Sequence, residues 1–296
     1  MKKEINEYLL IPYRFAVLLL LYALQRLSFY WFNTDLFSNT QLSDWTLMMA
    51  GGLKFDICAL IYLNGLWMVI YIFSLWAKVK PVMRRISDAV FYTFNILGLL
   101  TNCIDFIYYR FILKRTTYNV LDILAGEDNL GKLGLRFLLD YWYVLLYFIV
   151  LIFVFVYLIR LVRPSLTPIR NRILYIVCAL CVLALVALLS VGGIRGDFKH
   201  STRPITISNA AAYTASPEES AIVLNTPFSF IRTIGKKGFE HYDYFSEDEI
   251  ESIYSPVHLC TSDSVATPTH KNVVIFILES FSREFVGYLN QNRIPD

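Results

Sequence analysis

The residues with the clearest chemical potential lie in the stretch Asn272 to Phe285, which reads NVVIFILESFSREF. Val273 to Leu278 is an unbroken apolar run with β-branched residues, which predicts a strand buried on both faces of a parallel sheet. Glu279 follows directly, at the carboxyl end of the strand, where parallel sheets bind their ligands. We therefore expect its carboxylate to be a hard oxygen ligand for a divalent cation. Ser280 would cap a helix beginning near Phe281, whose N-terminus favours an anion. The simpler alternative is that Glu279 only caps the next turn.

A second set of polar residues lies inside or at the ends of long apolar stretches. The set comprises Arg26, Asp56, Asn102, Asp105, Tyr109 and Arg110. Asn102, Asp105 and Tyr109 are spaced i, i+3 and i+7, so they share one face of a helix. Ionisable groups within a membrane are costly unless they pair, face the bundle interior or meet a polar ligand. One interpretation is an ion pair of Arg26 with Asp105 or Asp56 that locks helices together. The other is a seat for a phospholipid headgroup in the outer leaflet.

The elements that must position these residues are membrane-spanning. The chain is 56% hydrophobic and 16% aromatic, with a mean hydropathy of +0.49, which is too apolar for a soluble domain of 296 residues. The net charge is only +3, and the basic residues cluster beside apolar segments, so nucleic-acid binding is not expected. Five stretches are long enough to span a bilayer, for which about 20 apolar residues are needed. They are Ile11 to Phe32, Phe55 to Trp76, Ala89 to Leu113, Tyr141 to Ile159 and Ile173 to Val191.

The distribution of basic residues predicts the orientation of these spans. Lysines and arginines are densest before the first span, between the second and third, and between the fourth and fifth, and they are sparser on the opposite side. By the positive-inside rule the N-terminus is cytoplasmic, and an odd number of spans places everything after Val191 outside. The predicted location is therefore a cytoplasmic membrane crossed several times, with the C-terminal part outside the cytoplasm.

The composition turns polar after Gly192 and Gly193, and capping signals predict short helices in the region that follows. Ser216 to Glu219 and Ser246 to Glu249 have the capping-box pattern, and Thr226-Pro227 predicts the start of another helix. This last helix has an apolar face that suits either the membrane surface or packing on its own outer domain. A helix from Thr117 to Leu124 is expected between the third and fourth spans.

The predicted fold is therefore an all-α membrane protein. A five-helix transmembrane bundle covers residues 1–192, a helical extracytoplasmic connector covers residues 193–270, and residues 271–296 hold the first strand of an α/β domain. A strand cannot stand alone, because its backbone groups would have no partners. We therefore expect the sequence to be the N-terminal portion of a longer protein.

The layout, together with the run HKNVVIFILESFSREFVG, resembles the lipoteichoic acid synthase-like membrane proteins of the sulfatase and alkaline-phosphatase superfamily. In that family the acid after the first strand of the outer domain binds a catalytic divalent metal, typically manganese, and this role carries over to Glu279. The family's nucleophile and its other metal ligands lie further along the outer domain, beyond Asp296. Residues 1–296 alone are therefore expected to be inactive.

The resemblance implies transfer of a phospholipid headgroup, of the phosphoglycerol type, to an acceptor in the bacterial cell envelope. The chemistry would be a two-step phosphotransfer through a metal-activated hydroxyl. Two alternatives stay open. One is a phosphoethanolamine transferase of the same superfamily, in which the acid usually follows a glycine, whereas here Leu278 precedes Glu279. The other is a non-catalytic membrane module that binds lipid or a partner.

Overall fold

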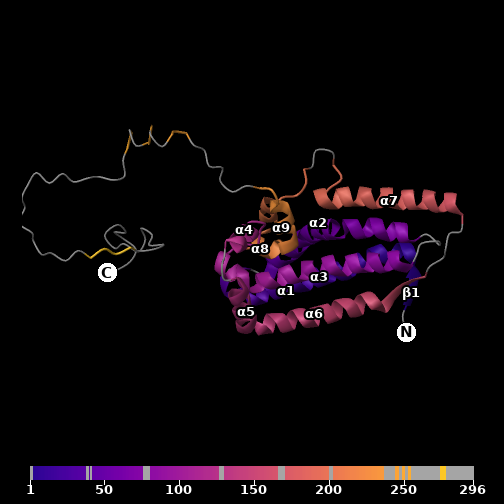
Figure 1. Ribbon diagram of the computed structural model, residues 1–296, viewed down its shortest axis with the longest axis horizontal. Coiled ribbons are helices and arrows are strands. Elements are labelled where there is room, and N and C mark those ends of the chain that lie inside the picture. Colours follow the sequence, from indigo (N-terminus) through magenta and orange to yellow (C-terminus); the bar gives the residue numbers. More distant parts are fainter. Residues whose placement is uncertain are drawn as a thin grey trace, which may run out of the picture. The chain divides into compact units, whose positions relative to one another are not determined.

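The computed structural model describes most of the first 236 residues and a few short segments after them. The described residues are 3–37, 40, 42–75, 81–126, 130–165, 171–199, 203–236, 244–246, 249–250, 253–254 and 274–277. The chain divides into two compact units, Met1–Lys237 and Gly238–Asp296. The first unit contains the helices and strands labelled in Figure 1.

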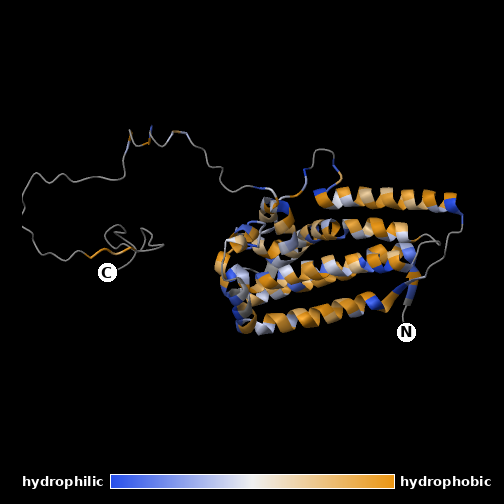
Figure 2. Cartoon of the chain, in the orientation of Figure 1, coloured by the Kyte–Doolittle hydropathy of each residue, from blue (hydrophilic) through white to orange (hydrophobic). Residues whose placement is uncertain are grey.

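Five helices of the first unit are long and apolar enough to cross a membrane, as the sequence predicts. They are α1 (Leu10–Phe32), α2 (Leu42–Ser74), α3 (Pro81–Ile112), α6 (Trp142–Leu161) and α7 (Arg172–Arg195). Figure 2 shows the apolar colour running along most of their length. Two helices begin earlier than predicted, α2 at Leu42 rather than Phe55 and α3 at Pro81 rather than Ala89. Hydropathy marks the apolar part of a helix, whereas the helix itself continues through polar residues until a cap ends it.

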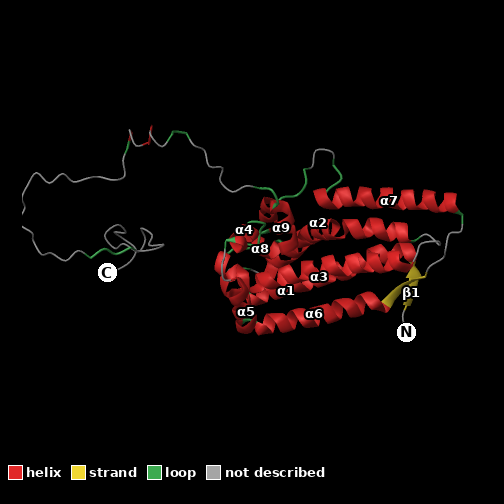
Figure 3. Cartoon of the chain, viewed as in Figure 1, coloured by secondary structure: helices red, strands yellow, loops and turns green. Residues whose placement is uncertain are grey.

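Helices α1 and α2 run in opposite directions. Tyr71 of α2 donates a hydrogen bond of 2.7 Å to the carbonyl of Glu7, just before α1, and Arg26 further along α1 pairs with Asp56 of α2. The two helices are therefore antiparallel, and Figure 3 shows the long helices lying side by side. We call the end of the bundle where α1 and α3 finish and α6 begins the connector end.

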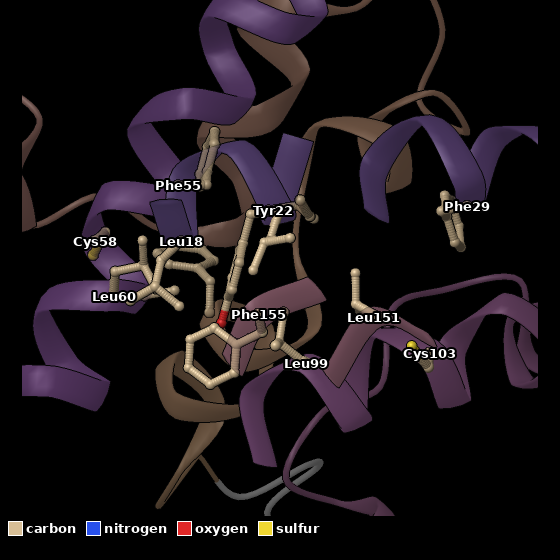
Figure 4. Close-up of a cluster of buried hydrophobic side chains, with 14 of the residues drawn as sticks. Leu18, Tyr22, Phe29, Phe55, Cys58, Leu60, Leu99, Cys103, Leu151 and Phe155 are labelled. Carbon is tan, nitrogen blue, oxygen red and sulfur yellow. The ribbon is translucent and has the colours of Figure 1, made fainter. Parts of the chain in front are cut away.

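The core of the bundle consists of aromatic and aliphatic side chains from α1, α2, α3 and α6. Figure 4 shows Leu18, Tyr22, Leu99 and Phe155 gathered in this core, and none is more than 2% exposed. Helix α2 is central, since 56% of its most apolar window is buried, whereas α7 is peripheral, with 11% buried. In a membrane such helices associate through van der Waals packing and internal hydrogen bonds rather than through the hydrophobic effect.

A two-stranded parallel sheet in the first unit was not expected from the sequence. Strand β1 (Lys3–Asn6) pairs with β2 (Val162–Ser165), with Lys3 opposite Val162. Each strand has four residues, and β2 contains a proline, so neither shows the apolar alternation by which strands are identified. The sheet ties the start of α1 to the end of α6.

The remaining elements of the first unit are short. They are η1 (Glu7–Leu9), η2 (Thr34–Leu36), α4 (Val120–Ala125), α5 (Leu130–Asp140), η3 (Ile207–Tyr213), α8 (Ser220–Val223) and α9 (Thr226–Thr233). The helix predicted from Thr117 to Leu124 corresponds to α4. Helix α8 starts after a turn at residues 217–219, and the Glu219 carboxylate accepts the Ser216 N–H at 3.2 Å, as in a capping box.

Helix α9 begins where the Thr226-Pro227 signal predicts, and part of it packs on the transmembrane bundle. Its N-cap is Asn225, whose side chain accepts the Phe228 N–H at 2.8 Å. Phe228 is fully buried, and its ring lies 5.0 Å from that of Phe55 on α2. The helix therefore docks on the bundle itself.

The second unit bears on two predictions. The capping box at Ser246 is confirmed, since its hydroxyl and backbone N–H both donate to the Glu249 carboxylate at 2.9 Å. The buried strand is not found: Val274 to Ile277 are 70–92% exposed, and the sheet of the described residues contains only β1 and β2. A strand needs a hydrogen-bonding neighbour, which these residues lack among the described ones. Glu279 and Ser280 lie outside the described residues, so the α/β domain stays a prediction.

Candidate functional site

A buried ion pair of α1 and α2 is the centre of the candidate site, which lies at the connector end of the bundle. Nη2 of Arg26 donates to both carboxylate oxygens of Asp56 at 2.6 Å, and the two side chains are 2% and 3% exposed. Breaking such a pair by removing one partner is strongly destabilising, because the other charge stays buried. Of the two pairings expected for Arg26, the structure has the one with Asp56.

The same arginine also holds the connector. Nη1 of Arg26 donates to the carbonyls of Ile222, at 2.8 Å, and Val223. Nε of Arg115, from the loop after α3, donates to the carbonyl of Ala221 at 2.8 Å. Because α8 has only four residues, these carbonyls have no place in a longer helical ladder and need other partners. The side chains of Arg26 and Arg115 are these partners, because they donate hydrogen bonds to the carbonyls.

Asp105 of α3 is the second buried carboxylate, and it also binds the connector. It accepts hydrogen bonds from the Thr226 hydroxyl at 2.6 Å, from the Thr116 N–H at 3.0 Å and from the Thr116 hydroxyl. Arg115 lies 3.9 Å away, measured from Nη1 to a carboxylate oxygen, and is the nearest cation paired with it. Asp105 is fully buried, so these donors replace the water that a carboxylate otherwise needs.

Amide side chains join the two carboxylates into one network. Asn225 donates to Asp56 at 2.9 Å, and Asn102 accepts the Thr226 N–H at 2.9 Å. Asn102 also donates to the side-chain oxygen of Gln25 at 3.1 Å. We call the whole set the junction network. Its members are Gln25, Arg26, Asp56, Asn102, Asp105, Arg115, Thr116, Asn225 and Thr226.

Arg115 is charged within this network despite its burial. It is 5% exposed, and burial lowers the pKa of its guanidinium to about 10, against the opposing effect of Asp105, while Arg26 lowers it further. At neutral pH the group therefore keeps its proton. Its guanidinium carbon also lies 3.5 Å from the centre of the Phe29 ring, a cation–π contact that compensates for lost hydration.

Two of the expected site residues lie apart from the network. Tyr109 is buried, with its ring 5.0 Å from that of Phe29 and 5.6 Å from that of Phe37, so it is part of an aromatic cluster. Arg110 points to the surface and pairs with Asp35, and their side chains are 43% and 69% exposed. Such an exposed pair contributes at most about 1 kcal/mol.

The space enclosed by the network is small. A cavity of about 10 Å³ is lined by Tyr22, Gln25, Arg26, Asn102, Arg115, Leu224 and Asn225. This volume accommodates about one water molecule. Four of the expected site residues therefore lie close together, namely Arg26, Asp56, Asn102 and Asp105. Their polar atoms bind the connector, where one interpretation expected a lipid headgroup. The geometry favours the interpretation in which these charges lock chain segments together.

Several members of the junction network are not among the residues expected from the sequence. Arg115 reads as one more basic loop residue, and Gln25 is a single amide inside an apolar stretch. Asn225 could have been identified, since an asparagine before Thr-Pro is a common N-cap. Its second bond, to Asp56, joins residues 169 positions apart and leaves no local pattern.

No metal site is present among the residues that the structure describes, which contain no group of three or more histidine, cysteine, aspartate or glutamate side chains placed to hold an ion. Glu279, the expected manganese ligand, lies outside them. No protein-family model, no curated protein and no solved structure matches the chain.

Proposed function

We propose that the chain is the N-terminal membrane portion of a divalent-metal-dependent phosphotransferase that moves the headgroup of a phospholipid, of the phosphoglycerol type, to an acceptor in the cell envelope. The observation that carries the proposal is the junction network. It fixes the connector from Ala221 to Thr226 on the ends of three apolar helices. A domain that follows such an anchored connector starts at the membrane surface, where a lipid headgroup is accessible.

The catalytic part of the proposal rests on Glu279 and on the resemblance of its surroundings to the sulfatase superfamily. A divalent metal, with manganese the expected ion, would activate a hydroxyl nucleophile and stabilise the charge of the transferring phosphoryl group. Glu279 would supply one anionic oxygen ligand. Within residues 3–236 the role of the described side chains is to hold and orient: Arg26, Arg115 and Asp105 keep the connector on the bundle.

The test is headgroup release by the complete protein in phospholipid vesicles. With manganese and phosphatidylglycerol we expect release of diacylglycerol, and Glu279→Gln should abolish it because the site loses an anionic ligand. Glu249→Gln is the control, since it makes the same chemical change at an acid of the second unit that takes part in a capping box with Ser246. Near-normal turnover by Glu279→Gln would reject the proposed role. Release from phosphatidylethanolamine, but not from phosphatidylglycerol, would select the phosphoethanolamine alternative.

The orientation in the membrane is a separate part of the proposal. The basic loops and the five apolar helices support a cytoplasmic N-terminus and an external second unit. Alkaline phosphatase fused after Asp296 should be active in cells, and the same enzyme fused at Lys80 should be inactive. The reverse pattern would contradict this orientation.

A further inference from the structure

A second cavity, much larger than that of the junction network, lies beside it in the first unit. Its volume is about 710 Å³, within the range of about 300–1,000 Å³ typical of ligand pockets. The walls come from α3, α4, α5, α6 and α9. They are mainly apolar, with Ile104, Leu121, Phe137, Val144, Leu145 and Phe230 among the lining residues. Among the residues that the structure describes, no aspartate, glutamate, lysine, arginine or histidine lines the cavity.

The position of this cavity restricts its occupant. Helices α3 and α6 are two of the five that are apolar enough to span a membrane, so hydrocarbon chains surround this part of the molecule. A protein helix has a diameter of about 10 Å and needs a straight space of that width. A flexible hydrocarbon chain has no such minimum width.

The polar groups at the junction side explain why the cavity suits a tail rather than a headgroup. Thr116 and Thr226 line it, and the hydroxyl of each already donates to Asp105. Arg26 and Arg115 are likewise engaged by Asp56 and by connector carbonyls. No free cation therefore faces the cavity to bind a phosphate among the residues that the structure describes there.

We infer that this cavity binds one acyl chain of a membrane phospholipid and holds the lipid with its headgroup beyond the connector end. The inference deepens the proposed function and rests on it for the identification of that lipid as the headgroup donor. The methylenes of such a chain are already out of water in the bilayer, so packing contacts within the cavity would select chains by length rather than by charge.

The two glycines of α5 provide a matched pair of variants. Gly134 lines the cavity, and a Cβ atom added to it would meet no heavy atom within 4 Å. Gly131 lies three residues earlier in the same helix, has equally open space, and does not line the cavity. A larger side chain at Gly134 therefore starts in open space and would occupy part of the cavity, whereas Gly131→Phe makes the same chemical change elsewhere. Both gain helix propensity over glycine to the same extent.

The experiment is photo-crosslinking of the full chain in vesicles that contain phosphatidylglycerol with a diazirine on one acyl chain. We expect labelled peptides from α3, α5 and α6. Gly134→Phe should lower that labelling severalfold, because its ring takes up part of the cavity, and Gly131→Phe should leave it within about twofold. Gly134→Leu, a smaller addition, should give an intermediate loss and serves if the phenylalanine variant unfolds.

Two results would overturn the inference. One is labelling that Gly134→Phe and Gly134→Leu both leave unchanged. The other is labelling spread evenly onto α7, which would show only contact with bulk lipid. The outcome is separable from the fate of the proposed function: cavity-dependent labelling without headgroup release supports the acyl-chain site and rejects the transferase. Release without cavity-dependent labelling does the opposite.

Discussion

Helix α1 carries two buried arginines, and their surroundings differ. Arg26, at the connector end, pairs with Asp56, which is 3% exposed, and donates to two connector carbonyls. Arg14, near the other end, donates to Asp88 at 2.8 Å, but the Asp88 side chain is 54% exposed. Two arginines on the same helix thus have different partners. The partner of Arg26 is a buried aspartate, and the partner of Arg14 is an aspartate exposed to solvent.

Aromatic rings complete the second site. The Arg14 guanidinium carbon lies 4.3 Å from the centre of the Phe91 ring and 5.1 Å from that of Trp67. Two of its nitrogens, Nε and Nη1, are buried without a hydrogen-bond partner among the described residues. Ring faces stabilise a cation without directional bonds. Arg14 therefore behaves as a packed cation at the bundle end, whereas Arg26 joins three chain segments and fixes their geometry.

The largest effect is expected from breaking the pair at the connector end. Asp56→Leu should lower the free energy of unfolding by about 3–5 kcal/mol, because Arg26 is left as an uncompensated buried charge. The measurement is thermal unfolding of the purified protein in detergent micelles. A double-mutant cycle with Arg26→Met should give a coupling of about 1–3 kcal/mol. A coupling near zero would show that the two side chains act independently.

A smaller effect is expected from crowding Arg26 instead of removing its partner. A Cβ atom added to Gly52 would lie 2.2 Å from the Arg26 guanidinium carbon, so Gly52→Ala must displace that group from Asp56. We expect a loss of about 1–3 kcal/mol, as for other overpacked sites. Gly65→Ala on the same helix is the control, since its Cβ meets nothing within 4 Å, and it should be neutral or stabilising. Equal stability of the two variants would contradict the close approach at Gly52.

The corresponding cycle at the other end should give a weaker result. Asp88→Asn combined with Arg14→Met is expected to show a coupling below about 1 kcal/mol, since water screens a carboxylate that is more than half exposed. The assay is the same unfolding measurement. A coupling as large as that of Arg26 with Asp56 would remove the contrast between the two arginines.

The smallest effect concerns an exposed carboxylate of the second unit. The Ser246 N–H, and after it the Ser246 hydroxyl, lowers the pKa of Glu249 below its ordinary value. A depressed pKa stabilises the folded turn above the unfolded pKa, and this contribution is lost as the pH falls through the folded pKa. In an NMR titration, Ser246→Ala should move the pKa of Glu249 part of the way back up, because alanine removes the hydroxyl but keeps the backbone N–H. An unchanged pKa would show that the capping box does not form in solution.

Much of the bundle could be predicted from the sequence, because the apolar stretches are long and local. Only two of the start points, Leu42 and Pro81, differ by more than a turn from expectation. The burial of Arg26, Asp56, Asn102 and Asp105 also followed from their place in these stretches, where polar groups must face the bundle interior.

Apart from the pairing of Arg26 with Asp56, their partners could not be predicted, because these partners are contributed by residues distant in the sequence. Arg26 binds carbonyls at Ile222 and Val223, and a backbone carbonyl has no signature in the side-chain sequence. Strand β1 likewise has no recognisable sequence pattern. It is too short to show the alternation of apolar and polar residues, and its partner β2 follows four spans later in the chain. The sequence therefore does not indicate which distant backbone groups bind a given buried charge.

The order of synthesis gives the junction network a further consequence. Arg26 and Asp56 are 30 residues apart and can pair as soon as the second span has entered the bilayer. Asp105 accepts from Thr226, which the ribosome adds 121 residues later. The third span is therefore inserted while its buried carboxylate still lacks that donor, and the bundle is locked only after the chain beyond the fifth span has been delivered to the connector end. Membrane insertion and final locking are thus two separate events in the life of each molecule, and a nascent chain halted before Ala221 would hold five spans without the segment that fastens them.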